Sequence, residues 1–231
     1  MLNSLPKQFN ALVIGASGTI GAAFVDLLGN LPHCASVHGL HRQSTPPIDF
    51  ADENSVAEAA RVLGDRRYHL IINAAGLLHN DAFMPEKRLA DLNYEQMQAT
   101  FQANTFGPAL VLRHFVPLLA SERAIMAMLS AKVGSIGDNR LGGWYSYRAS
   151  KAALNMLVKT AAIEVARSQK NSVLVALHPG TVSSRLSQPF RGDSIGRAAQ
   201  DAAADMLHVI DQLTPADSGC FRSYNGAQLP W

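Results

Sequence analysis

Short apolar runs alternate with longer amphipathic segments along the whole chain. The runs are mostly continuous and are bounded by turn residues, which is typical of strands buried on both faces of a parallel sheet. Runs of this kind occupy residues 9–14, 36–40, 69–73, 124–129, 172–177 and 220–224. Apolar residues recur at helical spacing in residues 19–28, 54–63, 94–119, 145–168 and 197–212. Strand and helix therefore alternate from one end of the chain to the other.

This alternation predicts an α/β fold, a Rossmann-type doubly wound parallel sheet of about seven strands with helices on both faces. No internal repeat or Pro/Ser-rich linker divides the sequence, so residues 1–231 are expected to form a single domain. Residues 43–50 and 180–196 form loops that follow strands. Because ligands bind beyond the carboxyl ends of the strands in such sheets, we expect residues 180–196 to cover a substrate.

Composition argues against several other classes of protein. The chain has 20 Lys plus Arg against 18 Asp plus Glu, with the cations scattered, which argues against nucleic-acid binding. Mean hydropathy is +0.03, and no apolar run is long enough to span a membrane or resembles a signal peptide, so we expect a cytoplasmic protein. Cys34 and Cys220 lie far apart, and the eight histidines show no HxxxH or HExxH spacing. We therefore expect neither a disulfide framework nor a metal site.

A glycine-rich turn joins the first strand to the first helix. Binding a pyrophosphate requires a backbone that approaches closely and free N–H groups at a helix start. The spacing is GxxxGxG, which differs from GxGxxG and from a P-loop. The alternative is an ordinary Gly-rich turn. The candidate phosphate-binding residues are Gly15, Ser17, Gly18, Thr19, Ile20 and Gly21.

The residues after the second strand bear on which dinucleotide is bound. A free ribose 2′-hydroxyl is usually held by an acidic residue at this point, whereas a 2′-phosphate requires a cation. The chain has His41 and Arg42 there and no acid. This favours NADP(H) over NAD(H), with a solvated surface arginine as the alternative for Arg42.

Tyr147 and Lys151 are four residues apart near the start of a predicted helix, so both side chains share one face. A tyrosine has a pKa of about 10 and needs help to exchange its proton near neutral pH. A neighbouring ammonium favours the phenolate, so we expect Lys151 to lower the pKa of Tyr147. The same spacing also occurs by chance on solvated helices.

Together, these motifs resemble those of the short-chain dehydrogenases/reductases, and the match extends from about residue 9 to residue 224. The stretch GSIGDNRLGGWYSYRASKAALN is similar to the branch that contains C-factor-like proteins and sniffer-type carbonyl reductases. The residues that carry the resemblance are the glycine turn, Asn73-Ala74-Ala75-Gly76, Asn104, Tyr147 with Lys151, and Pro179-Gly180.

The resemblance implies specific roles. Tyr147 would be the general acid/base, Lys151 would assist it and bind the ribose, and Asn104 would hold a water of the proton relay. Asn73, Ala74, Ala75 and Gly76 would lie beside the adenine ribose, and Asp49 and Phe50 would flank the adenine. Pro179, Gly180, Val182 and Ser184 would face the nicotinamide, with Ser184 at a position usually held by threonine.

The catalytic serine of the family has no clear counterpart. Gly134 stands at the family's spacing from Tyr147, whereas Ala131 takes the serine's place when residues are counted from the strand end. Ser135 is slightly favoured, because it lies in a loop that could reach Tyr147, and Ser130 is the close alternative.

These residues predict an NADP(H)-dependent oxidoreductase that transfers hydride between the nicotinamide and a carbonyl or alcohol, without a metal. The alternative is a dinucleotide-binding regulator of C-factor type. A methyltransferase would leave Tyr147 and Lys151 unexplained. The resemblance also suggests a homodimer or homotetramer that pairs through residues 105–119 and 152–163, although the same residues could pack against their own sheet.

Overall fold

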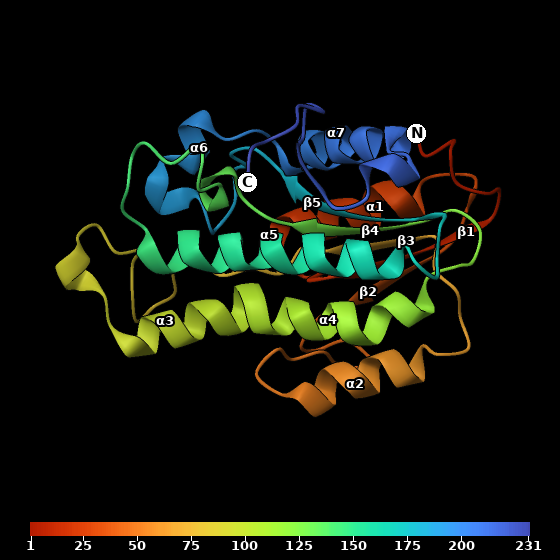
Figure 1. Ribbon diagram of the computed structural model, residues 1–231, viewed down its shortest axis with the longest axis horizontal. Coiled ribbons are helices and arrows are strands. Elements are labelled where there is room, and N and C mark those ends of the chain that lie inside the picture. Colours follow the sequence, from red (N-terminus) through yellow and green to blue (C-terminus); the bar gives the residue numbers. More distant parts are fainter.

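Six parallel strands form one sheet in the computed structural model, which describes residues 1–231 (Figure 1). Their order across the sheet is β2-β1-β3-β4-β5-β6, one strand fewer than the approximate count expected from the sequence. The strands are β1 (Phe9–Ile14), β2 (Cys34–Leu40), β3 (Leu70–Asn73), β4 (Ala124–Leu129), β5 (Ser172–His178) and β6 (Cys220–Ser223).

Helices cover both faces of this sheet, as the pattern predicted. Figure 1 shows α1 and α7 on one side and α2, α4 and α5 on the other. The helices are α1 (Thr19–Gly29), α2 (Glu53–Val62), α3 (Tyr94–Phe101), α4 (Gly107–Phe115), α5 (Tyr145–Val165), α6 (Gly192–Ile195) and α7 (Ala199–Gln212). No helix is both long enough and apolar enough to cross a membrane.

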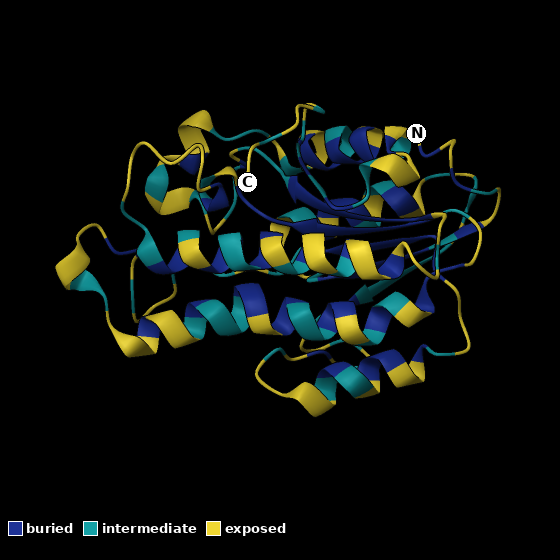
Figure 2. Ribbon diagram, in the orientation of Figure 1, coloured by how far each residue is buried: buried dark blue, intermediate teal, exposed yellow.

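Strand side chains alternate between two cores, one on each face of the sheet. In β4, Met126 and Met128 pack with the α2, α4 and α5 side, whereas Ile125 and Ala127 pack with the α1 and α7 side. All four are fully buried, and Figure 2 shows the sheet as the most buried layer. Continuous apolar runs are therefore required here, because neither strand face meets water.

The long helix expected over residues 94–119 is interrupted. Its first part, α3, has Asn93 as its N-cap, and the Asn93 side chain accepts a hydrogen bond from the Gln96 backbone N–H at 2.9 Å. After α3, residues Gln102–Phe106 form a π-helical turn, and α4 then continues to Phe115. Such turns insert a residue into the helical ladder and occur frequently at functional sites. Here the π-helical turn contains Asn104.

The strand order reverses between β1 and β3, because the chain passes from β1 to β2 on one side and enters β3 on the other. Ile14 pairs with Asn73, so the segments that follow these two strands lie next to each other. A crevice at such a switch point is where an open parallel sheet binds its ligand. The glycine turn and the Asn73–Gly76 segment border it.

Candidate active site

The glycine turn packs tightly against the segment that follows β3. Gly15 has a φ of +81°, and a Cβ there would lie 2.7 Å from the Ala75 backbone nitrogen. A Cβ at Gly21 would lie 2.1 Å from the Gly15 carbonyl oxygen. Both glycines are thus needed to bring the start of α1 up to the neighbouring chain.

The N-terminus of α1 is left open. Gly18 is its N-cap and has no side chain to accept from the first-turn N–H groups, and no acidic residue lies in that turn. The donors and the positive end of the helix dipole are therefore available to an anion. This arrangement suits a pyrophosphate.

Two adjoining cavities of about 380 and 580 Å³ lie at this edge of the sheet, and both include Gly18, Arg42 and Gly76 in their walls. Such volumes are in the range of cofactor sites. The smaller cavity is bordered by Asp49 and Phe50, and the larger one by Ser184. Thirteen of the cofactor-binding residues expected from the sequence line them: Gly15, Ser17, Gly18, Thr19, Ile20, His41, Arg42, Asp49, Phe50, Ala74, Ala75, Gly76 and Ser184.

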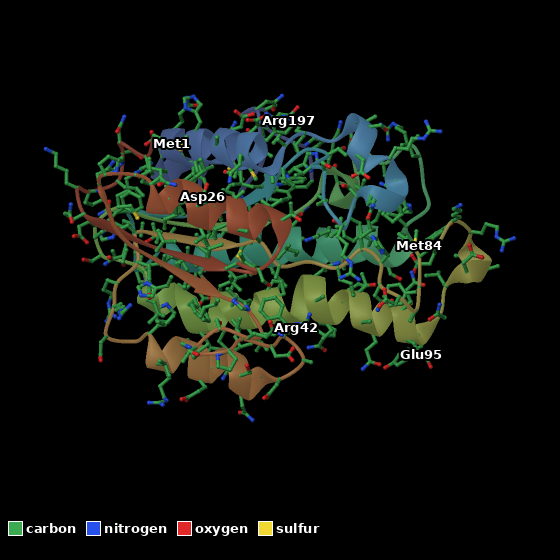
Figure 3. The ribbon with its side chains drawn as sticks, turned by 180° about the vertical axis from the view of Figure 1, so that it is seen from behind. Met1, Asp26, Arg42, Met84, Glu95 and Arg197 are labelled. Atoms are coloured by element: carbon green, nitrogen blue, oxygen red, sulfur yellow. The ribbon has the colours of Figure 1, made fainter.

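Arg42, labelled in Figure 3, lines both cavities, and Arg185 is a second arginine in the wall of the larger one. The exposed guanidinium of Arg42 has no hydrogen bond or ion pair within the protein. His41 differs, because its Nδ1 accepts from the Gln43 backbone N–H at 3.2 Å. Asp49 accepts from the Ala51 backbone N–H at 2.9 Å. Arg42 is thus free to bind an anionic group.

The other cofactor-binding residues expected from the sequence do not line these two cavities. Asn73 accepts from the Ala75 backbone N–H at 3.2 Å and so fixes the turn after β3. Gly180, next to Pro179, has a φ of +77°, and a Cβ there would lie 2.7 Å from the Tyr224 ring. Val182 is buried, and its backbone forms an isolated parallel β-bridge with that of Arg197.

Tyr147 and Lys151 are both buried in the first two turns of α5, with 8% and 3% exposure. The Lys151 Nζ lies 5.9 Å from the centroid of the Tyr147 ring and donates to the Leu129 carbonyl at 2.9 Å. Gly134 lies against this helix, where a Cβ would come within 2.7 Å of the Lys151 Cβ. The Leu129 carbonyl, at the end of β4, therefore holds the Lys151 ammonium near the Tyr147 ring.

Burial dominates the ionisation of this pair. It raises the pKa of Tyr147 above its ordinary value and lowers the pKa of Lys151 to about 8. The expectation that the ammonium lowers the pKa of Tyr147 is contradicted, because removal of the phenol from water outweighs a cation that binds the Leu129 carbonyl. Tyr147 therefore keeps its proton and suits the role of an acid.

Asn104 is fully buried, and its amide joins the segment after β3 to α5. Its Oδ1 accepts from the Leu77 N–H at 2.8 Å, and its Nδ2 donates to the Leu77 carbonyl at 2.7 Å. The same Nδ2 lies 3.1 Å from Ser150 Oγ. A Cβ on Gly76 would lie 3.3 Å from Asn104 Oδ1 and 3.5 Å from Lys151 Nζ, so both polar groups border the same backbone.

Neither candidate serine is hydrogen-bonded to Tyr147. Ser130 Oγ donates to Asn155 Oδ1 at 2.6 Å, two turns further along α5. Ser135 Oγ lies 3.3 Å from the Trp231 carbonyl and accepts from the Asp138 N–H at 3.1 Å. Ala131 instead packs in one buried cluster with Leu78 and Tyr147. The role of Ser135 or Ser130 stays a prediction.

Comparison with known proteins identifies the family. A family model described as enoyl-(acyl carrier protein) reductase matches residues 29–219. A 1-hydroxy-2-glutathionyl-2-methyl-3-butene dehydrogenase from Rhodococcus sp. (strain AD45) is 33% identical over 188 residues, covering 80% of this chain and 79% of that protein. The chain belongs to the short-chain dehydrogenase/reductase family.

Other short-chain dehydrogenases/reductases support this assignment. The C-signal protein of Myxococcus xanthus is 37% identical over 144 residues, which cover 62% of this chain and 83% of that protein. The solved structure of NADPH-bound carbonyl reductase from chicken fatty liver has a TM-score of 0.83 and 25% identity, covering 98% of this chain and 100% of that one. Carbonyl reductase Sniffer of D. melanogaster, at 23% identity, has the same TM-score over 97% of this chain and 100% of its own, and shows the shared fold. The chain is therefore an oxidoreductase of this family.

Sequence reasoning missed Glu86, which caps α5, the helix that contains Tyr147 and Lys151. This carboxylate is 2% exposed, accepts from the Ser146 backbone N–H at 3.2 Å and binds the Ser146 hydroxyl. It thereby satisfies a donor that the start of α5 would otherwise leave without a partner. Because Glu86 and Ser146 are 60 residues apart, the only available signal is an acidic residue beside Pro85 in a long loop.

Proposed function

We propose that the chain is an NADP(H)-dependent reductase of aldehydes or ketones, with Tyr147 as its acid. The observation that carries the proposal is the burial of Tyr147 with Lys151 beside the crevice at the sheet's switch point. The NADPH-bound chicken carbonyl reductase, with the same fold, supports the choice of cofactor and reaction. Arg42 supports the preference for the 2′-phosphate form, because it borders both cavities and has no protein partner.

The crevice fits such a dinucleotide. Gly15, Gly18 and the open start of α1 would hold the pyrophosphate, and Arg42 would bind the 2′-phosphate. The smaller cavity, bordered by Asp49 and Phe50, would take the adenine end. Ser184 and the Pro179–Val182 segment would lie toward the nicotinamide end.

When bound, the cofactor supplies the hydride that adds to the carbonyl carbon. Tyr147 donates its proton to the carbonyl oxygen, so that an aldehyde or ketone becomes an alcohol. The Lys151 ammonium then stabilises the phenolate that remains, and it can return a proton because burial lowers its pKa to about 8. Asn104 fixes Leu77 beside this pair and would hold the relay water near Lys151.

The test uses the purified protein with NADPH and a panel of aldehydes, ketones and quinones, followed by the fall in cofactor absorbance. We expect turnover with part of the panel, and at least a hundredfold lower kcat for Tyr147→Phe. Turnover by Tyr147→Phe at the wild-type rate would refute the assigned acid. The same panel with Ser130→Ala and Ser135→Ala tests the two serines.

A dinucleotide-binding regulator is the second candidate, and the similarity to the C-signal protein of Myxococcus xanthus favours it. The buried Tyr147 and Lys151 pair argues for catalysis, because binding the ribose would explain the lysine alone and would not require a tyrosine buried next to it. Tight NADPH binding without depletion by any carbonyl in the panel would support the regulator.

We also propose that the protein assembles as a homodimer or homotetramer through α4 and α5. A hollow of about 460 Å³ on this surface is lined by apolar residues of both helices and of the turn after α4, among them Leu112, Val116, Leu157 and Ala161. On α5, Met156 and Ile163 expose 66% and 53% of their surface. Light scattering after size exclusion gives the mass directly, and Ile163→Glu should shift it toward the monomer.

A further inference from the structure

Trp144 precedes α5 in a backbone conformation that a bulky residue rarely adopts. Its φ and ψ are +53° and +44°, in the left-handed region. The two preceding residues, Gly142 and Gly143, also have positive φ, and as glycines they do so at no steric cost. The next position, three residues before Tyr147, nevertheless holds a tryptophan and not a third glycine. Such strain clusters at functional sites when the surrounding structure enforces it.

Contacts from Glu86 and Arg148 hold this conformation. The Trp144 N–H donates to the Glu86 backbone carbonyl, and the Glu86 carboxylate binds Ser146 in the first turn of α5. The Arg148 guanidinium donates to the carbonyls of Gly142, Gly143 and Val133 at 2.9 to 3.2 Å. The loop before α5 is therefore held at several points, and the indole has a defined position.

The indole lies between Tyr147 and Phe190, which comes from the substrate-covering loop. The Trp144 and Phe190 ring centroids are 4.8 Å apart at an interplanar angle of 58°, and Trp144 lies 6.2 Å from the Tyr147 ring. The ring centroids of His79 and Phe190 are 5.9 Å apart. A wall of aromatic rings thus extends from the proposed acid to the loop that covers it.

A small cluster of apolar side chains packs with Tyr147. They are Leu78, Ala131, Val133, Trp144 and Phe190. The nearby cations already have partners: Lys151 donates to the Leu129 carbonyl at 2.9 Å, and Arg185, in the wall of the larger cavity, pairs with Asp81 at 3.6 Å. A charged substrate group would therefore lose its hydration at this wall without gaining a partner. A flat ring would find aromatic faces and edges to contact.

We infer that Trp144 and Phe190 form a ring-binding wall that selects uncharged carbonyl compounds whose carbonyl is conjugated to a planar ring. This inference rests on the proposed function, because it names the substrate class of the same site. Trp144 is the specificity residue, and Glu86 and Arg148 are positioning residues that act through it.

Three aldehydes of similar size test the selectivity: benzaldehyde, cyclohexanecarbaldehyde and 4-carboxybenzaldehyde. The measured quantity is the ratio of kcat/KM for benzaldehyde to that for cyclohexanecarbaldehyde, which removes differences common to both substrates. We expect this ratio to fall about tenfold in Trp144→Asn, because asparagine tolerates the left-handed conformation but lacks the ring. Trp144→Phe should keep the ratio within about twofold of wild type. Wild type should turn over 4-carboxybenzaldehyde at least tenfold less efficiently than benzaldehyde.

Leu141→Ala is the matched control, because Leu141 lies in the same loop with 92% exposure. It should leave both ratios unchanged. An unchanged ring preference in Trp144→Asn, or equal use of the charged and uncharged aromatic aldehydes by wild type, would overturn the inference.

A binding measurement separates this inference from the proposed reaction. Calorimetry with the protein and NADP⁺ compares benzyl alcohol with cyclohexylmethanol, and neither titration requires turnover. Tighter binding of benzyl alcohol that is lost in Trp144→Asn would uphold the ring-binding wall even if no aldehyde were reduced. Equal binding of the two alcohols by wild type would overturn it even if aldehydes were reduced.

Discussion

Replacing Lys151 by methionine removes an ammonium that the fold buries almost completely, and the structure gives the size of the effect. Burial lowers the pKa of Lys151 from 10.5 to about 8. One pH unit of such a difference corresponds to about 1.36 kcal/mol, so keeping this lysine charged costs the native state about 3 kcal/mol. Lys151→Met should therefore lose activity. At pH 7 it also removes this cost from the native state, which favours a higher free energy of unfolding.

The pH dependence isolates this contribution from other consequences of the substitution. Below pH 8 both the native and the unfolded protein hold the proton, and the native state bears the full cost. Between pH 8 and 10.5 the native state releases the proton first, so the free energy of unfolding of wild type rises with pH. Relative to Lys151→Met, wild type should gain about 2–3 kcal/mol between pH 7 and 10.

Urea unfolding of both proteins at several pH values measures this difference. Lys159→Met is the matched control, because it removes the same charge from an exposed position of α5. If the difference in unfolding free energy between wild type and Lys151→Met stays constant from pH 7 to 10, burial does not lower the pKa of Lys151. In the active protein the same ionisation should lower kcat for carbonyl reduction as the pH rises through about 8, because the tyrosinate then loses its neighbouring cation.

Three further changes have defined outcomes. Arg42→Ala should raise KM for NADPH about tenfold or more and leave KM for NADH nearly unchanged, measured from initial rates with each cofactor; equal changes would contradict the role in 2′-phosphate binding. Glu86→Gln should lower the free energy of unfolding by about 1–3 kcal/mol, because a charged acceptor at Ser146 and the helix start is lost, whereas the exposed Glu95→Gln should change it by about 0.5 kcal/mol or less. Ala131→Ser should raise kcat severalfold by placing a hydroxyl in the cluster with Tyr147, while an effect of Ser135→Ala alone would instead assign that role to Ser135.

Local sequence patterns specified most of the fold and the cofactor crevice. The glycine turn was predictable because Gly15 and Gly21 are required by close backbone approach, which the spacing reveals. Tyr147 and Lys151 were predictable because helical periodicity alone places residues four apart on one face. The continuous apolar strands likewise gave the parallel sheet.

Features that depend on distant parts of the chain could not be predicted. The apolar pattern runs through the π-helical turn at Asn104 without a break, and the one local sign of it is Pro108, which has no N–H to donate to the Asn104 carbonyl. The sign of the Tyr147 pKa change depends on desolvation, which spacing does not show. Glu86 reaches Ser146 only through the tertiary fold, and the left-handed Trp144 depends on that contact.

Tyr147 is assigned as the group that protonates the carbonyl oxygen while NADPH is consumed, and a single-turnover experiment isolates this step. Single-turnover oxidation of NADPH by wild type and Tyr147→Phe, with the best aldehyde of the panel and with cofactor binding confirmed for both, follows the reaction itself. The account predicts that Tyr147→Phe binds NADPH as wild type does but oxidises it at least a hundredfold more slowly. Equal oxidation rates in the two proteins would contradict it.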